Sequence, residues 1–218
     1  KRKYVYENEK VVLPSKLFIK DKYVNTQRDF VFSDLIKNGE FTCHACLKVI
    51  RRGILQENNL YFKENIKSED IEWYLRVLTF INSYALISNP FYIYRAQRVG
   101  SITNTIGLQN MIDLVHTISE RNEYIETVKN KYSKLFLNCY KSYLAYQLTI
   151  VYGYYNFLEQ EDKKVLKVEI KKLTSLLKYT LYKKTIYIMF MYRLLGLSIT
   201  SKILSNYISL RKKGKISW

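Results

Sequence analysis

The chain has 218 residues, of which 48% are hydrophobic and 15% are aromatic. This composition excludes an intrinsically disordered chain and is sufficient for a buried core. The scarcity of glycine (7) and proline (2) favours helices over a turn-rich all-β fold, and an odd set of 3 cysteines argues against a disulfide scaffold.

The formal net charge of +17 is concentrated near the C-terminus. Residues 163–218 hold 14 Lys or Arg and a single acid, Glu169, whereas residues 1–162 carry a net charge of only +4. Such a region is expected to bind an anionic partner, which leaves lipid headgroups, nucleic acid or an acidic protein as candidates. The apolar stretch 185–199 is interrupted by Arg193 and is shorter than the ~20 residues of a spanning helix, so a helix lying on a membrane is favoured over one that crosses it.

The first part of the chain has a mixed pattern. YVY (4–6) and KVVL (10–13) predict two short strands. Asn25 or Thr26 is expected to cap a helix that runs to about residue 37 and is closed by Gly39. A second helix is expected over 46–58, either broken by Gly53 or ending near Asn58.

A third helix is predicted to begin at Ser68, because apolar residues follow at the i, i+3, i+4, i+7 spacing of one helix face. Ser68 is the expected N-cap. Beyond it, YALIS (84–88) and FYIYR (91–95) predict short strands on either side of Asn89-Pro90.

From about residue 107 the periodicity is helical throughout. Over 132–155 the apolar side chains fall on one stripe, and further helices are predicted over 163–181 and 185–210. The tyrosines of this part lie at core spacing, which favours packing over the stacking of nucleic-acid bases. The sequence therefore predicts a mixed α/β region at 1–106 with a few short strands, then a mostly α-helical region at 107–218, and a helix-dominated chain overall.

Two adjacent carboxylates, Glu69 and Asp70, open the third helix. Acidic residues in a first turn complement the helix dipole, and on composition alone this structural role is favoured. The alternative is catalytic: a carboxylate within hydrogen-bond reach of an attacking hydroxyl acts as a general base.

Two other patterns have weaker chemical interpretations. Cys43-His44-Ala45-Cys46 has the spacing of half a zinc site, but no second pair completes the four ligands, so we predict small buried thiols and no metal site in this chain. Arg95, Arg98, Ser101 and Thr103 belong to a basic loop suited to phosphate oxygens, although a solvated loop is the simpler interpretation.

A series of short motifs lies in a fixed order within residues 45–104. They are Ala45, Lys48 and Arg51; Leu55; Leu60-Tyr61-Phe62; Glu69-Asp70; Leu86-Ile87; Tyr92-Ile93-Tyr94-Arg95; and Gly100-Ser101-Ile102-Thr103. In this order and spacing they resemble the acceptor-side half of family 2 glycosyltransferases, the bacterial enzymes that assemble capsule, O-antigen and other surface polysaccharides. Ile50 replaces an aromatic residue usual in that family.

The resemblance implies a GT-A fold and transfer of a sugar, with inversion, from a nucleotide-sugar donor to a saccharide or lipid-linked acceptor. It implies that Asp70 is the general base and that Glu69 positions it or touches the acceptor. The further substrate-binding candidates are Trp73 against a sugar face, Arg95 and Arg98 at the donor diphosphate, and Ser101 and Lys48.

The family binds Mg²⁺ or Mn²⁺ through a D-x-D motif in its nucleotide-binding half, and this sequence contains no D-x-D. The resemblance therefore implies a C-terminal portion that is inactive alone, and a cytoplasmic protein peripheral to the inner face of the membrane. The alternative is a non-catalytic basic helical module that binds a membrane surface, a protein or, less favoured, nucleic acid.

Overall fold

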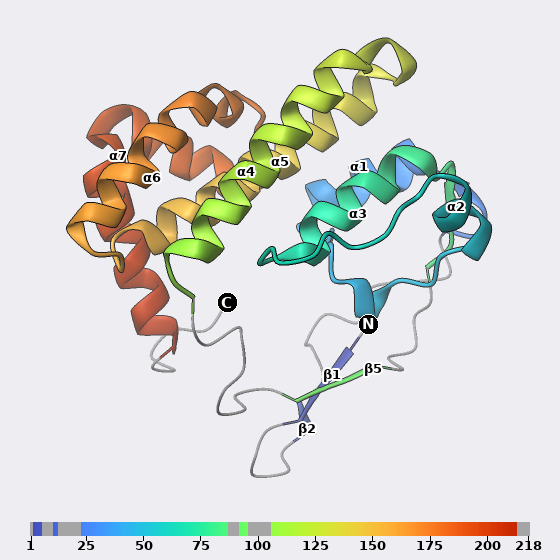
Figure 1. Ribbon diagram of the computed structural model, residues 1–218, viewed down its shortest axis with the longest axis horizontal. Helices are drawn as coiled ribbons and strands as arrows, with labels where there is room; N and C mark the ends of the chain where they lie inside the picture. The colour runs from blue at the N-terminus through green and yellow to red at the C-terminus, as the bar shows by residue number, and fades with distance from the viewer. Residues whose placement is uncertain (1, 6–10, 13–22, 87–91, 96–105, 213–218) are drawn as a thin grey trace. The chain divides into compact units, whose positions relative to one another are not determined.

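The computed structural model describes residues 2–5, 11–12, 23–86, 92–95 and 106–212 (Figure 1). Helices make up most of these residues and the strands are few and short, which confirms the helix-dominated fold class. The chain forms two compact units. The first comprises Lys1–Val31, Thr42–Glu64 and Glu69–Ile106, and the second comprises Phe32–Phe41, Asn65–Ser68 and Gly107–Trp218. The predicted division was contiguous, whereas two short segments of the N-terminal part belong to the second unit.

The strands belong to the first unit. Strand β1 (Arg2–Val5) pairs antiparallel with β2 (Val11–Val12) and parallel with β5 (Tyr92–Arg95), which gives the sheet order β2-β1-β5. Strands β3 (Thr26–Gln27) and β4 (Ser83–Tyr84) form a separate antiparallel pair. Short strands were predicted close to β1, β2 and β5; β3 was not predicted, because two residues carry no detectable alternation.

Helix α1 (Arg28–Lys37) ends as predicted, with Gly39 in the left-handed region at φ 69°. Its start differs from the prediction, because Thr26 pairs in a strand instead of capping the helix. The segment 45–58 contains a 3₁₀ helix (Ala45–Leu47) and α2 (Arg52–Glu57). The prediction of one helix over 46–58 was therefore wrong in its first half, because residues 48–51 are not helical. Gly53 lies inside α2 and does not break it, and the expected end near Asn58 is confirmed.

Helix α3 (Glu69–Phe80) confirms the predicted periodicity. Its buried face includes Tyr74 and Leu75 and, one turn further along the helix, Leu78. Ser68 has φ 61°, in the left-handed region, whereas an N-cap residue normally has extended backbone angles. The predicted capping role of Ser68 is therefore not supported by its backbone conformation.

The second unit is a helical assembly of α4 (Leu108–Thr127), α5 (Lys134–Tyr155), α6 (Gln160–Leu173) and α7 (Lys183–Lys212), with 3₁₀ helices at Lys129–Lys131 and Thr174–Lys178. Helix α5 packs against α4, α6 and α7 (Figure 1, yellow-green to red). Ser133 caps α5 by accepting a hydrogen bond from the Phe136 amide at 3.0 Å. The predicted stripe of α5 is buried, which confirms its role in packing; it includes Phe136, Cys139, Tyr140, Tyr143, Leu144, Leu148, Val151, Tyr152 and Tyr155.

Helix α7 bends at Gly196, where φ is 70° and ψ is −179°. Only glycine adopts such a conformation readily, so the chain continues as two helical segments. By length and composition α7 is apolar enough to cross a membrane, and only 17% of its most apolar window is buried. This is the one such helix among the described residues.

Candidate functional site

Asp70 lies in the first turn of α3, and its side chain is 34% exposed. The neighbouring Glu69 is exposed as well. The positive end of the helix dipole favours negative charge at this position, and the exposure leaves the Asp70 carboxylate accessible to a substrate. The geometry thus meets the first requirement of a general base, which is access to an incoming hydroxyl.

The nearest printed partner of Asp70 is His44. The distance from His44 Nδ1 to Asp70 Oδ2 is 3.9 Å, too long for a hydrogen bond but within the range of an ion pair when the imidazole is protonated. His44 comes from the segment before the 3₁₀ helix Ala45–Leu47, far from Asp70 in sequence. Sequence reasoning considered His44 only as a metal ligand and missed this pairing.

Lys48 lies close to the Asp70–His44 pair. Its Nζ donates a hydrogen bond to the Thr42 carbonyl at 2.7 Å and is 4.5 Å from the centroid of the Tyr74 ring. The Tyr74 hydroxyl in turn is 2.6 Å from that of Tyr84. Lys48 therefore fixes the Thr42–Lys48 segment against α3, and its predicted contact with substrate stays a prediction.

Burial lowers the pKa of Lys48 from 10.5 to about 8, although the neighbouring Cys43, Cys46 and Asp70 act in the opposite direction. The same cause raises the pKa of Tyr74 well above its ordinary value. The pKa of the buried Lys48 ammonium is thus much closer to neutral pH than that of an exposed lysine. Its charge is therefore costly to the folded state at neutral pH.

We expect the unfolding free energy of the wild type to rise, relative to Lys48→Met, as the pH increases from about 8 to 10.5. Within this window the unfolded chain binds the extra proton, so deprotonation of folded Lys48 removes a cost of on the order of 3 kcal/mol. Urea denaturation of both proteins across this range measures the difference. Lys164→Met, at a side chain that is 73% exposed, is the matched control. A constant difference between wild type and Lys48→Met would contradict the buried-charge explanation.

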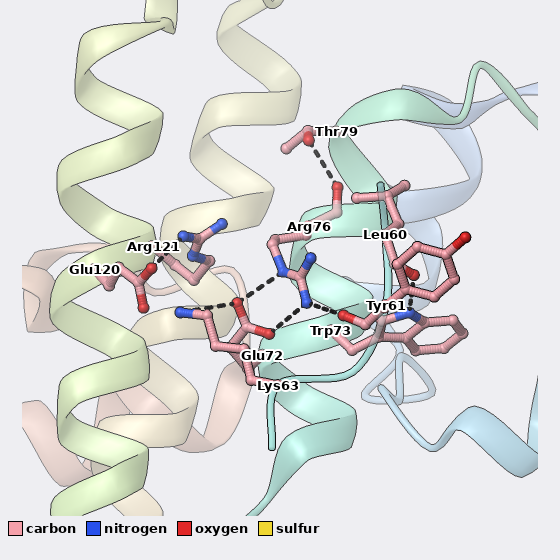
Figure 2. A network of polar contacts seen from close by, with 9 residues as sticks. All are labelled: Leu60, Tyr61, Lys63, Glu72, Trp73, Arg76, Thr79, Glu120 and Arg121. Carbon is pink, nitrogen blue, oxygen red and sulfur yellow. Dashed lines mark hydrogen bonds and ion pairs between the residues drawn. The ribbon is translucent and has the colours of Figure 1, made fainter. Parts of the chain in front are cut away.

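The opposite side of α3 carries a buried ion-pair network (Figure 2). The Glu72 side chain is 1% exposed, and it accepts two hydrogen bonds from Arg76, at 2.8 and 2.9 Å. Lys63 Nζ is 3.6 Å from Glu72 Oε1, and Arg76 also donates to the Tyr61 carbonyl. The network ties the segment that precedes α3 to the helix that bears Asp70.

Trp73 also connects α3 to the segment that precedes it. Its indole N–H donates to the Leu60 carbonyl at 2.9 Å (Figure 2), and Phe62 stacks on it with ring centroids 4.6 Å apart. The side chain is only 6% exposed. Because Phe62 already covers one face, this environment does not favour the predicted packing of Trp73 against a sugar.

The structure does not describe the side chains of the four predicted phosphate ligands. Arg98 and Ser101 lie outside the described residues, as does Thr103. Only the backbone of Arg95 is described, at the end of β5. Their roles stay predictions.

Cys43 is buried and Cys46 is partly buried, and neither forms a disulfide among the described residues. Over 23–86, 92–95, 106–212 and the short strands at the N-terminus, no group of three or more His, Cys, Asp or Glu side chains is placed to hold a metal ion. The described residues therefore do not form a site for the Mg²⁺ or Mn²⁺ that the resemblance implies.

Comparisons with protein families, curated proteins and solved structures found no match to this chain. The motifs of residues 45–104 and the geometry around Asp70 are therefore the features that bear on function.

Proposed function

We propose that this chain is the acceptor-side portion of an inverting glycosyltransferase of the family 2 type. The Asp70 carboxylate takes the proton of an acceptor hydroxyl, the hydroxyl oxygen attacks the anomeric carbon, and the nucleoside diphosphate leaves with the bonding electrons. The donor is a nucleotide sugar, and the acceptor is a saccharide or a lipid-linked saccharide.

The observation that carries this proposal is the accessible Asp70 carboxylate at the start of α3. Side chains on both sides of the helix support this part of α3. His44 and Lys48 lie on one side of the helix start, and the Glu72–Arg76 network holds the preceding segment on the other. Catalysis benefits from a base whose supporting shell is rigid, because a small displacement lowers the rate strongly. An acid that served only the helix dipole would need no such support.

The proposed location is the cytoplasm, at the inner face of a bacterial cell membrane. Lipid-linked acceptors are found there, and the +13 charge of residues 163–218 suits anionic headgroups, each Lys or Arg near the surface contributing about 1 kcal/mol. A nucleic-acid partner is disfavoured, because four tyrosines of α5, Tyr140, Tyr143, Tyr152 and Tyr155, are buried and cannot stack on bases.

A donor screen tests the proposed activity. The chain is joined to its donor-binding half, and a panel of nucleotide sugars is offered with and without Mg²⁺ or Mn²⁺, with release of nucleoside diphosphate as the readout. We expect turnover with at least one donor, lost in Asp70→Asn. Turnover that is independent of Asp70 would assign the chemistry to another group.

A further inference from the structure

The side chains of α7 are distributed in an unusual way. Within residues 183–211, all four buried side chains carry hydroxyl groups: Thr185, Thr200, Ser201 and Ser205. In a helix that packs on a protein core in water, the buried positions are normally the large apolar ones. The fully buried positions of α7 are therefore small and polar, and partly buried apolar side chains such as Leu204 and Ile208 make further contacts with α5.

These four buried positions gain little from the hydrophobic effect, because their side chains bury little apolar area. Thr185 Oγ1, Thr200 Oγ1 and Ser201 Oγ are buried and have no hydrogen-bond partner in the described structure. The two helices instead approach each other closely, because Gly153 of α5 lies directly against Leu204 and Ile208 of α7. Small and hydroxyl-bearing residues at a tight helix contact are typical of helices packed in a lipid environment.

The outward face of α7 is apolar. Its exposed large side chains recur every three or four residues in each segment, and Leu194 reaches 81% exposure. Residues so spaced share one helix face. The members of this outward apolar face are Tyr187, Phe190, Leu194, Leu195, Ile199, Ile203, Tyr207 and Leu210.

The bend at Gly196 restricts how the outward apolar face can contact a membrane, because it divides α7 into two short segments. Segments 183–195 and 197–212 are about 20 and 24 Å long at ~1.5 Å per residue, each shorter than the ~30 Å hydrocarbon core. Tyr192, before the bend, packs on Tyr152 with ring centroids 5.5 Å apart, and Ile208, after it, lies on the adjacent Gly153. Both segments therefore return to the same part of α5, which suits a helix pair lying on a bilayer.

The charges beside the outward apolar face identify the kind of surface. Lys183, Lys184, Arg193, Lys202 and Arg211 are exposed along α7, and no acidic residue follows Glu169. Basic side chains beside an apolar helix face are the pattern of interfacial membrane binding. The same charge opposes pairing with a second copy of this chain, because two such regions repel each other.

We propose that both segments of α7 insert their outward apolar face into the headgroup region of an anionic phospholipid bilayer, as a bent helix that does not cross it. This inference rests on the membrane location in the proposed function. It adds a defined apolar contact to the electrostatic attraction of the basic residues. The Lys and Arg side chains contact the lipid phosphates, and α5 holds the two segments against the rest of the second unit.

Co-sedimentation of the full chain with vesicles of phosphatidylcholine and phosphatidylglycerol tests this inference. Leu194→Glu/Ile203→Glu is expected to lower the partition coefficient by ~10-fold or more, because ten-fold corresponds to the loss of about one buried apolar side chain. Val165→Glu/Val168→Glu, at exposed apolar positions of α6, makes the same change in net charge and should bind much more tightly than the α7 variant. Circular-dichroism melting verifies that both variants fold.

Three results would overturn the inference. Equal loss in the two variants would leave only a charge effect, and absence of wild-type binding would remove the lipid partner. A wild-type dimer in lipid-free sedimentation, converted to monomer by the α7 changes, would assign the face to a second copy. The assay contains neither donor nor acceptor, so its failure leaves the Asp70 test of transfer unaffected, and failure of that test leaves lipid binding unaffected.

Discussion

Replacing Asp70 with asparagine is expected to reduce kcat for sugar transfer by ~10²- to 10⁴-fold, the usual contribution of a general base. Asparagine keeps the shape and the hydrogen-bonding ability of the side chain but lacks a basic oxygen. The Asp70 side chain is 34% exposed, so its change should leave the melting temperature within a few degrees of wild type. Steady-state kinetics and thermal melting on the same preparation measure the two effects separately.

Glu64→Gln is the matched control, because Glu64 is an exposed carboxylate shortly before α3 with no proposed role. It should retain wild-type turnover. If Asp70→Asn and Glu64→Gln have similar kcat values, Asp70 acts only on the helix dipole, and the proposed mechanism fails. If Asp70→Asn instead melts far below the wild type, the carboxylate is structural.

Replacing Glu72 with alanine is expected to lower the unfolding free energy of the first unit by about 3–5 kcal/mol, the cost of leaving a buried charge without its partner. Arg76, whose side chain is 17% exposed, would lose both hydrogen bonds to Glu72 and keep the one to the Tyr61 carbonyl. Urea denaturation of the variant measures this loss.

Glu161→Ala is the matched control for this prediction. Glu161 pairs with Lys164 at 2.7 Å, but the two side chains are 82% and 73% exposed, so the loss should stay below about 1 kcal/mol. Glu72→Met/Arg76→Met should be more stable than Glu72→Ala, because it removes both charges together. A cost below about 1 kcal/mol for Glu72→Ala would contradict the buried network.

The helices were predictable from sequence where the apolar residues follow a single helical period. The buried stripe of α5 and the buried face of α3 follow from residues three and four apart, which are neighbours on a helix whatever the tertiary fold. The ends were less predictable, since Thr26 pairs with Tyr84 and Ser68 adopts a left-handed conformation. Both outcomes depend on contacts or turns that local spacing does not encode.

The surroundings of Asp70 were only partly predictable. His44 and Lys48 approach α3 through the tertiary fold, and nothing in local spacing places them there. Glu72 and Arg76 have the i, i+4 spacing of an ion pair, but a charged residue is ordinarily expected at the surface, and Glu72 is buried. The orientation of α7 was likewise hidden, because its composition does not reveal which face packs on α5.

The setting of Trp73 makes the first unit separately observable by fluorescence. Trp73 is one of two tryptophans in the chain, and the other, Trp218, lies outside the described residues. With Trp218→Phe, the remaining indole emission comes from a ring shielded from solvent by Phe62 and anchored to Leu60. A red shift of that emission will report loss of the packing around the start of α3.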